Sequence, residues 1–288
     1  MTTNNTPATR EETLTADDGG RILLTFVAAE QPRSPIVYMP GMFTGRPFWL
    51  SDKGIGLAAY LAEAGFPGLI VQRREAGCGA RPGLEEHLRL DLPRVQTRVE
   101  ETWGRPAFWM GHSFGGVLSA RATAETLDAA RVAGLVLFGS QFEVGKRPLH
   151  PPFSLATRGI SALLGRFPAR RLGLGPRDEP PEAMHDAIRL VTEGRRRPEL
   201  RQALRKITAP ALAISGLGDK VDPTAGCEKL IGHFASTDKR FIAAGRRNGF
   251  EMDYDHPGIV VSKPAQQEIW PLVRDWLLER DVAVVSTN

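Results

Sequence analysis

Short apolar runs alternate with longer stretches of helical periodicity along most of the chain. Residues 35–39 (PIVYM) and 68–72 (GLIVQ) are almost continuously apolar, which is typical of strands buried on both faces of a parallel sheet. The same pattern predicts further strands at 21–28, 106–110, 134–138, 210–215 and 240–244. Helices are predicted between the strands. The first is expected to begin at a cap formed by Ser51 or Asp52, and the others are expected over about 84–103, from 113 onward, 224–235 and 264–280. This alternation implies a mostly parallel sheet with helices on both faces, an α/β fold.

Residues 141–205, which we call the insertion, do not follow this alternation. Two of its segments, FSLATRGISALLGRF and MHDAIRLVTEG, have apolar residues at helical spacing, and Gly and Pro separate them. The insertion also carries the basic excess of the chain. Residues 158–206 hold 12 Lys or Arg and 6 Asp or Glu, a net of +6, whereas the whole chain is +4. Either this is a solvated helical face, or it attracts an anionic substrate or anionic lipid.

Length and composition limit the remaining possibilities. A chain of 288 residues with 42% hydrophobic residues can bury a large core. Residues 1–12 are polar and are expected to form a flexible tail, because they lack the apolar region of a signal peptide. No apolar run approaches the roughly 20 residues of a transmembrane helix. Two cysteines without C-x-x-C spacing favour a reduced, cytoplasmic setting.

The sequence contains no phosphate-binding loop, no metal-ligand cluster and no dinucleotide fingerprint, so neither a cofactor nor a metal is expected. Nucleic acid is not an expected partner either, since the run Arg195-Arg196-Arg197 lacks interleaved aromatic residues. The sequence leaves the oligomeric state open.

The most specific motif is Gly111-His112-Ser113-Phe114-Gly115-Gly116, directly after the predicted strand at 106–110. It matches G-x-S-x-G, in which a strand turns sharply into a helix and a serine stands at the tip. Such a turn requires neighbours without side chains, because the serine is expected at positive φ. Ser113 is therefore the candidate nucleophile.

With this motif in this order of elements, residues 13–280 resemble the α/β-hydrolase superfamily. The resemblance implies an α/β-hydrolase core over 13–140 and 206–288, with residues 141–205 as a helical cap over the site. It also implies a triad in the order serine, acid, histidine. Asp219, in SGLGDKVDP after a strand, matches the acid loop, and His256, in DYDHPG, matches the late histidine. Asp222 on the same loop is the alternative acid.

The resemblance further implies an oxyanion hole made of two backbone N–H groups. Phe114 N–H, at the start of the helix, is the expected first donor. Relatives commonly carry His-Gly in the loop after the second strand, whereas this chain has Pro40-Gly41. Met42 N–H is therefore the expected second donor, with Phe43 as the alternative.

These residues predict a serine hydrolase that cleaves a carboxylic ester or thioester of a small acyl substrate through an acyl-enzyme. An acyltransferase would use the same triad and differ in excluding water. A peptidase or a carbon–carbon bond hydrolase would share the fold. A non-catalytic ligand-binding protein on the same fold is the alternative from a different class.

Overall fold

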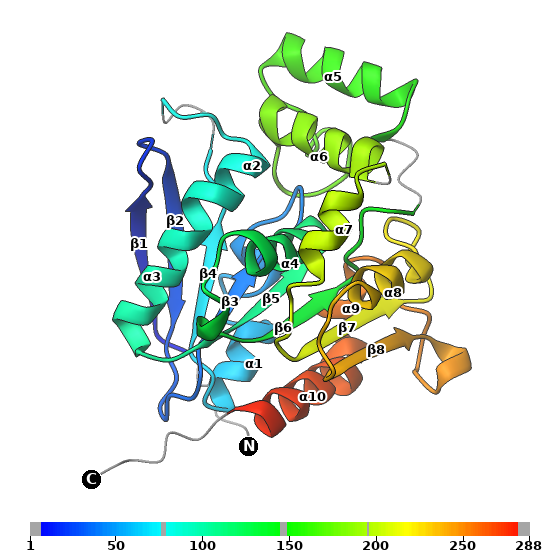
Figure 1. Cartoon of the computed structure of the whole chain (residues 1–288). Helices are drawn as coiled ribbons and strands as arrows, with labels where there is room; N and C mark the ends of the chain where they lie inside the picture. Colours follow the sequence, from blue (N-terminus) through cyan, green and yellow to red (C-terminus); the bar gives the residue numbers. More distant parts are fainter. Residues whose placement is uncertain (1–6, 76–78, 145–148, 195, 282–288) are drawn as a thin grey trace.

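The computed structural model describes residues 7–75, 79–144, 149–194 and 196–281. Its centre is one eight-stranded sheet in the order β1-β2-β4-β3-β5-β6-β7-β8 (Figure 1). The strands are β1 (Thr9–Thr15), β2 (Arg21–Val27), β3 (Ile36–Met39), β4 (Gly68–Gln72), β5 (Ala107–His112), β6 (Val132–Phe138), β7 (Ala211–Gly216) and β8 (Lys239–Ala244). Strands β3 to β8 run parallel, and β2 is antiparallel to both β1 and β4. The predicted parallel sheet is confirmed.

Strand β1 corrects the expectation of a flexible tail over residues 1–12. Residues 9–12 belong to this edge strand, which pairs with β2 from Thr9 opposite Val27 to Thr15 opposite Arg21. Most of its side chains are exposed; Leu14 packs against the core, and the Arg10 guanidinium lies over the Phe26 ring. Its stability comes from backbone hydrogen bonds to β2, and its polar composition is that of a solvated edge. Residues 1–6 lie outside the described residues.

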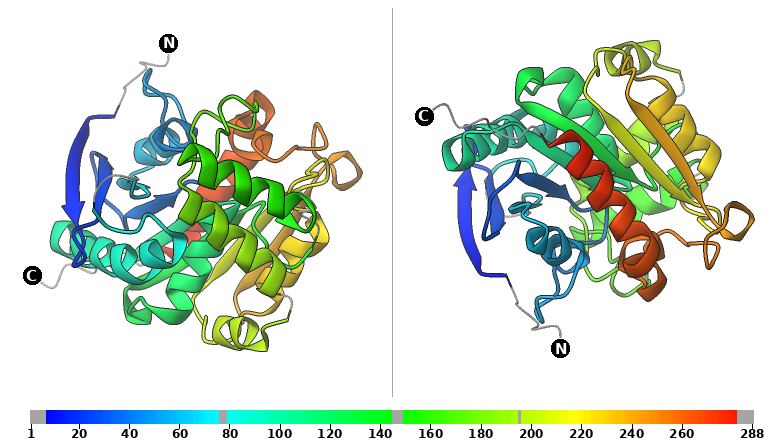
Figure 2. Two further views of the ribbon diagram at one scale, coloured as in Figure 1. Left: turned by 90° about the horizontal axis from the view of Figure 1, so that it is seen from above. Right: turned by 90° about the horizontal axis from the view of Figure 1, so that it is seen from below.

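Helices cover both faces of the sheet (Figure 2). On one face lie α2 (Leu84–Glu86), α3 (Leu92–Trp103), α4 (Phe114–Glu125), α7 (Pro198–Leu204) and α8 (Thr224–Gly232). On the other lie α1 (Leu57–Glu63), α9 (Gly258–Val261) and α10 (Lys263–Arg280). Side chains of β5 alternate between the two layers, since Trp109 packs with the first set and Phe108 and Met110 with the second. This alternation is the period of two expected for a strand buried on both faces.

Two predicted helices differ in detail. The first begins after Gly56, not at Ser51 or Asp52, because a 3-10 turn, η1 (Arg46–Phe48), and a following loop occupy those positions. The segment predicted as a helix over 84–103 is helical throughout. It contains a π-helical turn, η2 (His87–Asp91), between α2 and α3. Two further 3-10 turns are η3 (Ala129–Arg131) and η5 (Arg246–Asn248).

The insertion contributes α5 (Phe153–Leu164) and α6 (Pro181–Gly194) in addition to α7. Figure 1 shows α5 and α6 above the edge of the sheet where the parallel strands end, with α5 outermost. Apolar residues of α6 and α7, such as Leu190 and Leu204, join the core on the α4 face. No helix in the described residues combines the length and the apolar character needed to cross a bilayer.

Candidate active site

Ser113 stands at the tip of the turn between β5 and α4. Its backbone has φ 54° and ψ −126°, and it is one of two non-glycine residues with positive φ in the described chain. The Ser113 N–H donates to the Phe138 carbonyl at the end of β6 (2.9 Å), and the Ser113 carbonyl accepts the N–H groups of Gly116 and Val117 in the first turn of α4. The turn is thus held on both sides in a conformation that costs an L-residue energy, which is common at functional sites.

The glycines around Ser113 are required by close packing. A Cβ on Gly111 would lie 2.4 Å from the backbone of Gly116, and one on Gly115 would lie 2.2 Å from the Met39 carbonyl oxygen. Both distances are far below van der Waals contact. The first turn of α4 therefore packs directly on the end of β3 and on the loop that follows it.

His256 is held by two groups from other elements. Its Nδ1 lies 2.7 Å from Asp219 Oδ2, whose side chain is fully buried. Its backbone carbonyl lies 2.8 Å from the Nε2 of His112, and the His112 ring stacks on Phe48 (centroids 4.4 Å apart). Asp219 is itself fixed, because its Oδ1 accepts the N–H groups of Val221 and Asp222, both at 2.8 Å. Such contacts hold an imidazole in one orientation with Nε2 directed away from the carboxylate.

Asp222 does not contact His256 Nδ1; its side chain lies against Ser113 instead. Ser113 Oγ donates a hydrogen bond to Asp222 Oδ2 at 3.1 Å, and His256 Nε2 is 3.9 Å from the same oxygen. The other oxygen, Oδ1, accepts from the side-chain amide of Gln141 at 2.7 Å. Asp222 is completely buried. The structure therefore separates the two acids of the loop by their partners: Asp219 with the histidine, Asp222 with the serine.

The loop after β3 approaches Ser113 closely. A Cβ on Gly41 would lie 3.1 Å from Ser113 Cβ, so glycine permits this approach. In the described residues, the Met42 N–H has no acceptor within the protein, whereas the Phe43 N–H donates to Glu179 Oε1 at 2.6 Å. Phe43 is thus already engaged by the insertion. Of the two second donors considered, Met42 is the one whose N–H is left for a ligand.

Two residues of this site were not predicted from the sequence, Gln141 and Glu179. Glu179 is buried at the end of residues 175–179 of the insertion, which we call the strap. Glu179 also forms an ion pair with Arg73. The same strap donates Arg177 N–H to the Phe43 carbonyl (3.1 Å) and packs Gly175 on Phe43, which has φ 64°. Neither residue stands in a motif, and each acts through a partner far away in sequence, so no local signal marked them.

Other acidic and basic residues of the insertion mostly pair with one another or with the core. Glu143, the nearest acid after β6, lies 2.9 Å from His233 Nε2. A cavity of about 470 Å³ between the insertion and the loop after β4 is lined by arginines, among them Arg73, Arg166, Arg170 and Arg177, and by three acids. Three of the four named arginines have a carboxylate partner. Ser113 is not among the lining residues, so the cavity is separate from this serine.

Comparison with known proteins agrees with this architecture. A family model described as Alpha/beta hydrolase family matches residues 36–276. No curated protein sequence matches. Among solved structures, the chain is similar to a soluble variant of monoglyceride lipase from Saccharomyces cerevisiae, with 17% identity, 98% of each chain covered and a TM-score of 0.72.

It is also similar to an alpha/beta hydrolase, GrgF, from Penicillium sp. sh18, with 16% identity, 96% and 100% coverage and a TM-score of 0.69. A thermophilic esterase from Thermogutta terrifontis has 16% identity, 94% and 99% coverage and a TM-score of 0.65. At these identities the likeness shows the fold. Since the family model spans more than half of its length, the chain belongs to the alpha/beta hydrolase family.

Proposed function

We propose that this protein is a serine hydrolase that cleaves a carboxylic ester or thioester through an acyl-enzyme. The observation that carries the proposal is the arrangement around Ser113: a serine at positive φ, a histidine whose Nδ1 is held by a buried carboxylate, and the open Met42 N–H beside them. Lipase and esterase activities named for similar folds support the ester class.

In the proposed reaction, Ser113 Oγ attacks the carbonyl carbon of the substrate while His256 Nε2 takes the hydroxyl proton. The carbonyl oxygen becomes negative and is bound by the N–H groups of Met42 and Phe114. His256 then gives its proton to the leaving alcohol or thiol as the carbon–oxygen or carbon–sulfur bond breaks. Water, deprotonated by the same nitrogen, attacks the acyl-enzyme and regenerates Ser113.

Asp222 sets the starting position of the nucleophile in this scheme. The Ser113 hydroxyl points to Asp222 Oδ2, which lies 3.9 Å from His256 Nε2. Rotation of Ser113 about its Cα–Cβ bond exchanges one acceptor for the other. We expect a substrate carbonyl bound at the Met42 N–H to favour this exchange. Negative charge develops beside Ser113 Oγ during the attack, and the Asp222 carboxylate close to this oxygen would oppose it.

The acyl side of the substrate is proposed to lie against the insertion. Phe167, Ala169 and Met184 are buried together and pack on Met42 and Phe43. The Phe43 and Phe167 rings are 5.6 Å apart. This buried cluster makes the surroundings of the proposed oxyanion loop apolar, which supports an apolar acyl chain and the assignment of residues 141–205 as a cap. With its two cysteines, the chain is proposed to act in the cytoplasm.

The test uses Ser113→Ala with Ser119→Ala as its matched control. Ser119 is a buried serine of the same helix whose hydroxyl bonds to the Gly115 carbonyl (2.9 Å). We expect Ser113→Ala to abolish labelling by a fluorophosphonate probe and to lower kcat for a p-nitrophenyl ester at least ~10³-fold. Ser119→Ala should keep labelling and most of kcat. Labelling or turnover retained in purified Ser113→Ala enzyme would refute the mechanism.

A further inference from the structure

Helix α5 presents its apolar side chains to solvent. Of its 12 residues only Ser154 and Ser161 are buried. Five large apolar side chains of the helix are between 42% and 85% exposed: Phe153, Leu155, Ile160, Leu163 and Leu164. A helix on a globular protein normally buries its apolar face and exposes its polar one. In α5 this arrangement is reversed.

The reversal follows from the stripe of small polar residues that faces inward. Ser161 Oγ donates to the Thr157 carbonyl (2.7 Å) and Thr157 Oγ1 to the Phe153 carbonyl (3.1 Å), so these hydroxyls are satisfied within the helix. Ser154 and Ser161 are short enough to let α5 lie close to the rest of the insertion. The leucines stand on the remaining faces of the helix.

The exposed apolar side chains are concentrated in this one part of the molecule. Eleven large apolar residues are exposed in the described chain, and seven of them lie between Phe153 and Leu174, including Leu172 and Leu174 in the turn after α5. Single exposed apolar residues need no explanation, whereas a contiguous patch marks an interaction surface. We call these seven residues the α5 patch.

The segment that carries the α5 patch is basic. Residues 149–177 contain five Arg and no Lys, Asp or Glu, and Asp178, which follows them, pairs with Arg166. Within the described part of the chain, no carboxylate pairs with the side chains of Arg158, Arg170 or Arg171, all of which are exposed. Other arginines of the insertion differ in this respect: Arg197 pairs with Glu193 (2.6 Å), whereas Arg196 and Arg205 are exposed and have no carboxylate partner in the described residues. Three exposed arginines without a carboxylate partner in the described residues thus lie on or next to the apolar patch.

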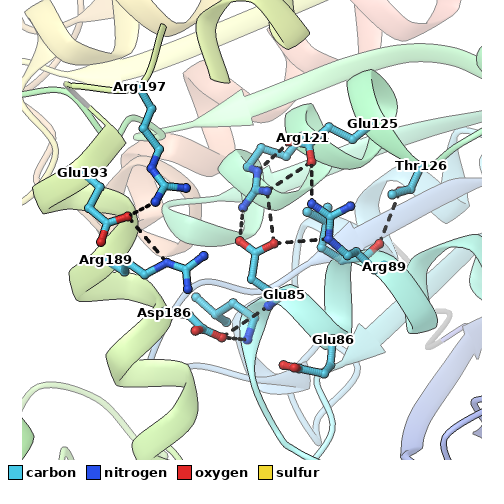
Figure 3. A network of polar contacts seen from close by, with 12 residues as sticks. Glu85, Glu86, Arg89, Arg121, Glu125, Thr126, Asp186, Arg189, Glu193 and Arg197 are labelled. Carbon is cyan, nitrogen blue, oxygen red and sulfur yellow. Dashed lines mark hydrogen bonds and ion pairs between the residues drawn. The ribbon is translucent and has the colours of Figure 1, made fainter. Parts of the chain in front are cut away.

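Helix α6, beneath α5, is fixed to the core. Asp186 Oδ2 accepts the Leu84 N–H at the start of α2 (2.9 Å), and Asp186 Oδ1 pairs with Arg81 (2.9 Å). Figure 3 shows Asp186 facing that end of α2, with Glu85 placed between Arg121 and Arg89. Because α6 is held in this way, the α5 patch stands on a fixed base at the outer end of the insertion (Figure 1).

We propose that the α5 patch docks the protein on the surface of a bilayer that contains anionic lipids. A helix of 12 residues is ~18 Å long, too short to span a hydrocarbon core of ~30 Å, so it would lie in the plane of the interface. Its leucines would enter the boundary between headgroups and acyl chains, and Arg158, Arg170 and Arg171 would contact anionic headgroups. Charge favours this occupant over a second copy of the chain, since two such patches face to face would bring the unpaired cations together.

The proposal does not depend on hydrolysis, and its test is done on the Ser113→Ala background so that lipid is not consumed. The measurement is flotation with vesicles of phosphatidylcholine alone and of phosphatidylcholine mixed with phosphatidylglycerol. The parent should float with the mixed vesicles, and added salt should weaken this binding. Leu155→Gln/Leu163→Gln/Leu164→Gln should lower the partition constant at least ~10-fold, because it removes apolar area that the membrane would bury.

The matched control is Ile55→Gln/Val261→Gln/Leu278→Gln, which removes three exposed apolar residues outside the α5 patch. It should bind mixed vesicles like the parent. A second variant, Arg158→Gln/Arg170→Gln/Arg171→Gln, should lose at least ~10-fold on mixed vesicles, at about 1 kcal/mol per basic residue, and little on phosphatidylcholine alone.

Absence of flotation in the parent, or equal flotation of the leucine and control variants, would overturn the proposal. Sedimentation velocity tests the remaining alternative, self-association of the protein. If the parent forms a dimer that the leucine variant abolishes, and neither binds vesicles, the α5 patch is a self-association surface instead of a membrane surface.

Discussion

At the scale of single residues, two carboxylates three positions apart in the candidate site have different partners. Asp219 and Asp222 are both buried, yet one bonds to His256 Nδ1 and the other to Ser113 Oγ. The loop separates them, because Asp219 Oδ1 accepts the Asp222 N–H and so turns the two side chains to different neighbours. Only the carboxylate on Nδ1 can hold the imidazole in the tautomer that accepts a proton at Nε2.

We therefore expect Asp219→Asn to lower kcat roughly 10⁴-fold while the protein remains folded. Asp222→Asn should cost less than about tenfold, a barrier change of ~1.4 kcal/mol or less. The reason is that the Gln141 amide would hold the carbonyl oxygen of the new asparagine, which turns its NH₂ toward Ser113 Oγ. Ser113 can then accept that bond and direct its own proton to His256. The comparison requires kcat on one ester and thermal melts of both variants, and a reversed ranking would give the triad role to Asp222.

At the scale of elements, the insertion holds the loop after β3, which carries the proposed oxyanion donor Met42. The strap before α6 supplies Gly175, Arg177 and Glu179, and all three contact Phe43. Glu179 accepts the Phe43 N–H, whereas the Met42 N–H has no acceptor within the described residues. We therefore expect a displacement of this strap to alter the proposed oxyanion hole without a direct effect on Ser113, His256 or Asp219.

Glu179 is thus predicted to be a positioning residue. Glu179→Ala should lower kcat about tenfold or more with a small change in KM, because a lost oxyanion donor weakens binding of the transition state alone. Glu179→Gln keeps an acceptor for the Phe43 N–H and should restore most of kcat. Asp178→Asn is the control, since its partner Arg166 is largely exposed. Equal losses in the Ala and Gln variants would contradict the positioning role and point to the Arg73 ion pair.

At the scale of the whole molecule, a buried polar network joins the antiparallel edge of the sheet to the helices. Arg74 follows β4, is buried, and pairs with Asp91 of η2 and with Asp18 in the β1–β2 turn. His87 Nδ1 lies 2.7 Å from Asp91 Oδ2. Burial lowers the pKa of His87 more than the Asp91 carboxylate raises it. Burial alone would raise the pKa of Asp91, but hydrogen bonds from His87 and Arg74 outweigh it and lower that pKa.

Both shifts have the same consequence for stability. A group whose pKa is lower in the folded state binds more protons when unfolded, so its contribution is present at high pH and lost as pH falls. For His87 the loss begins below its ordinary pKa of 6.5, and for Asp91 below 3.8. Tm should therefore fall between pH 7 and pH 5, and further in stronger acid.

His87→Gln should reduce the slope of Tm against pH in the upper part of this range, whatever it does to Tm itself. His185→Gln is the matched control, because His185 is an exposed residue of α6, and it should leave the slope as it is. Calorimetric melts across the range provide the measurement. An unchanged slope in His87→Gln would show that His87 does not cause the pH dependence of Tm in this range.

The sequence by itself determined the order of the strands and helices and the place of Ser113. Those features depend on local periodicity and on glycines next to the turn, whose requirements are met by residues close in the chain. Edge strand β1 was missed for the same reason: its exposed residues alternate without an apolar face, so only its pairing with β2 reveals it.

The tertiary structure decided which atoms of these residues meet. The Phe43 N–H is satisfied by Glu179, 136 positions away, and Asp222 is held by Gln141, 81 positions away. The reversed face of α5 was equally hidden, because its periodicity is that of any amphipathic helix and does not state which side is turned inward. Contacts between segments distant in sequence leave no local pattern, since many partners satisfy the same hydrogen bond or cover the same apolar stripe. The choice among them is made by the packing of the whole chain.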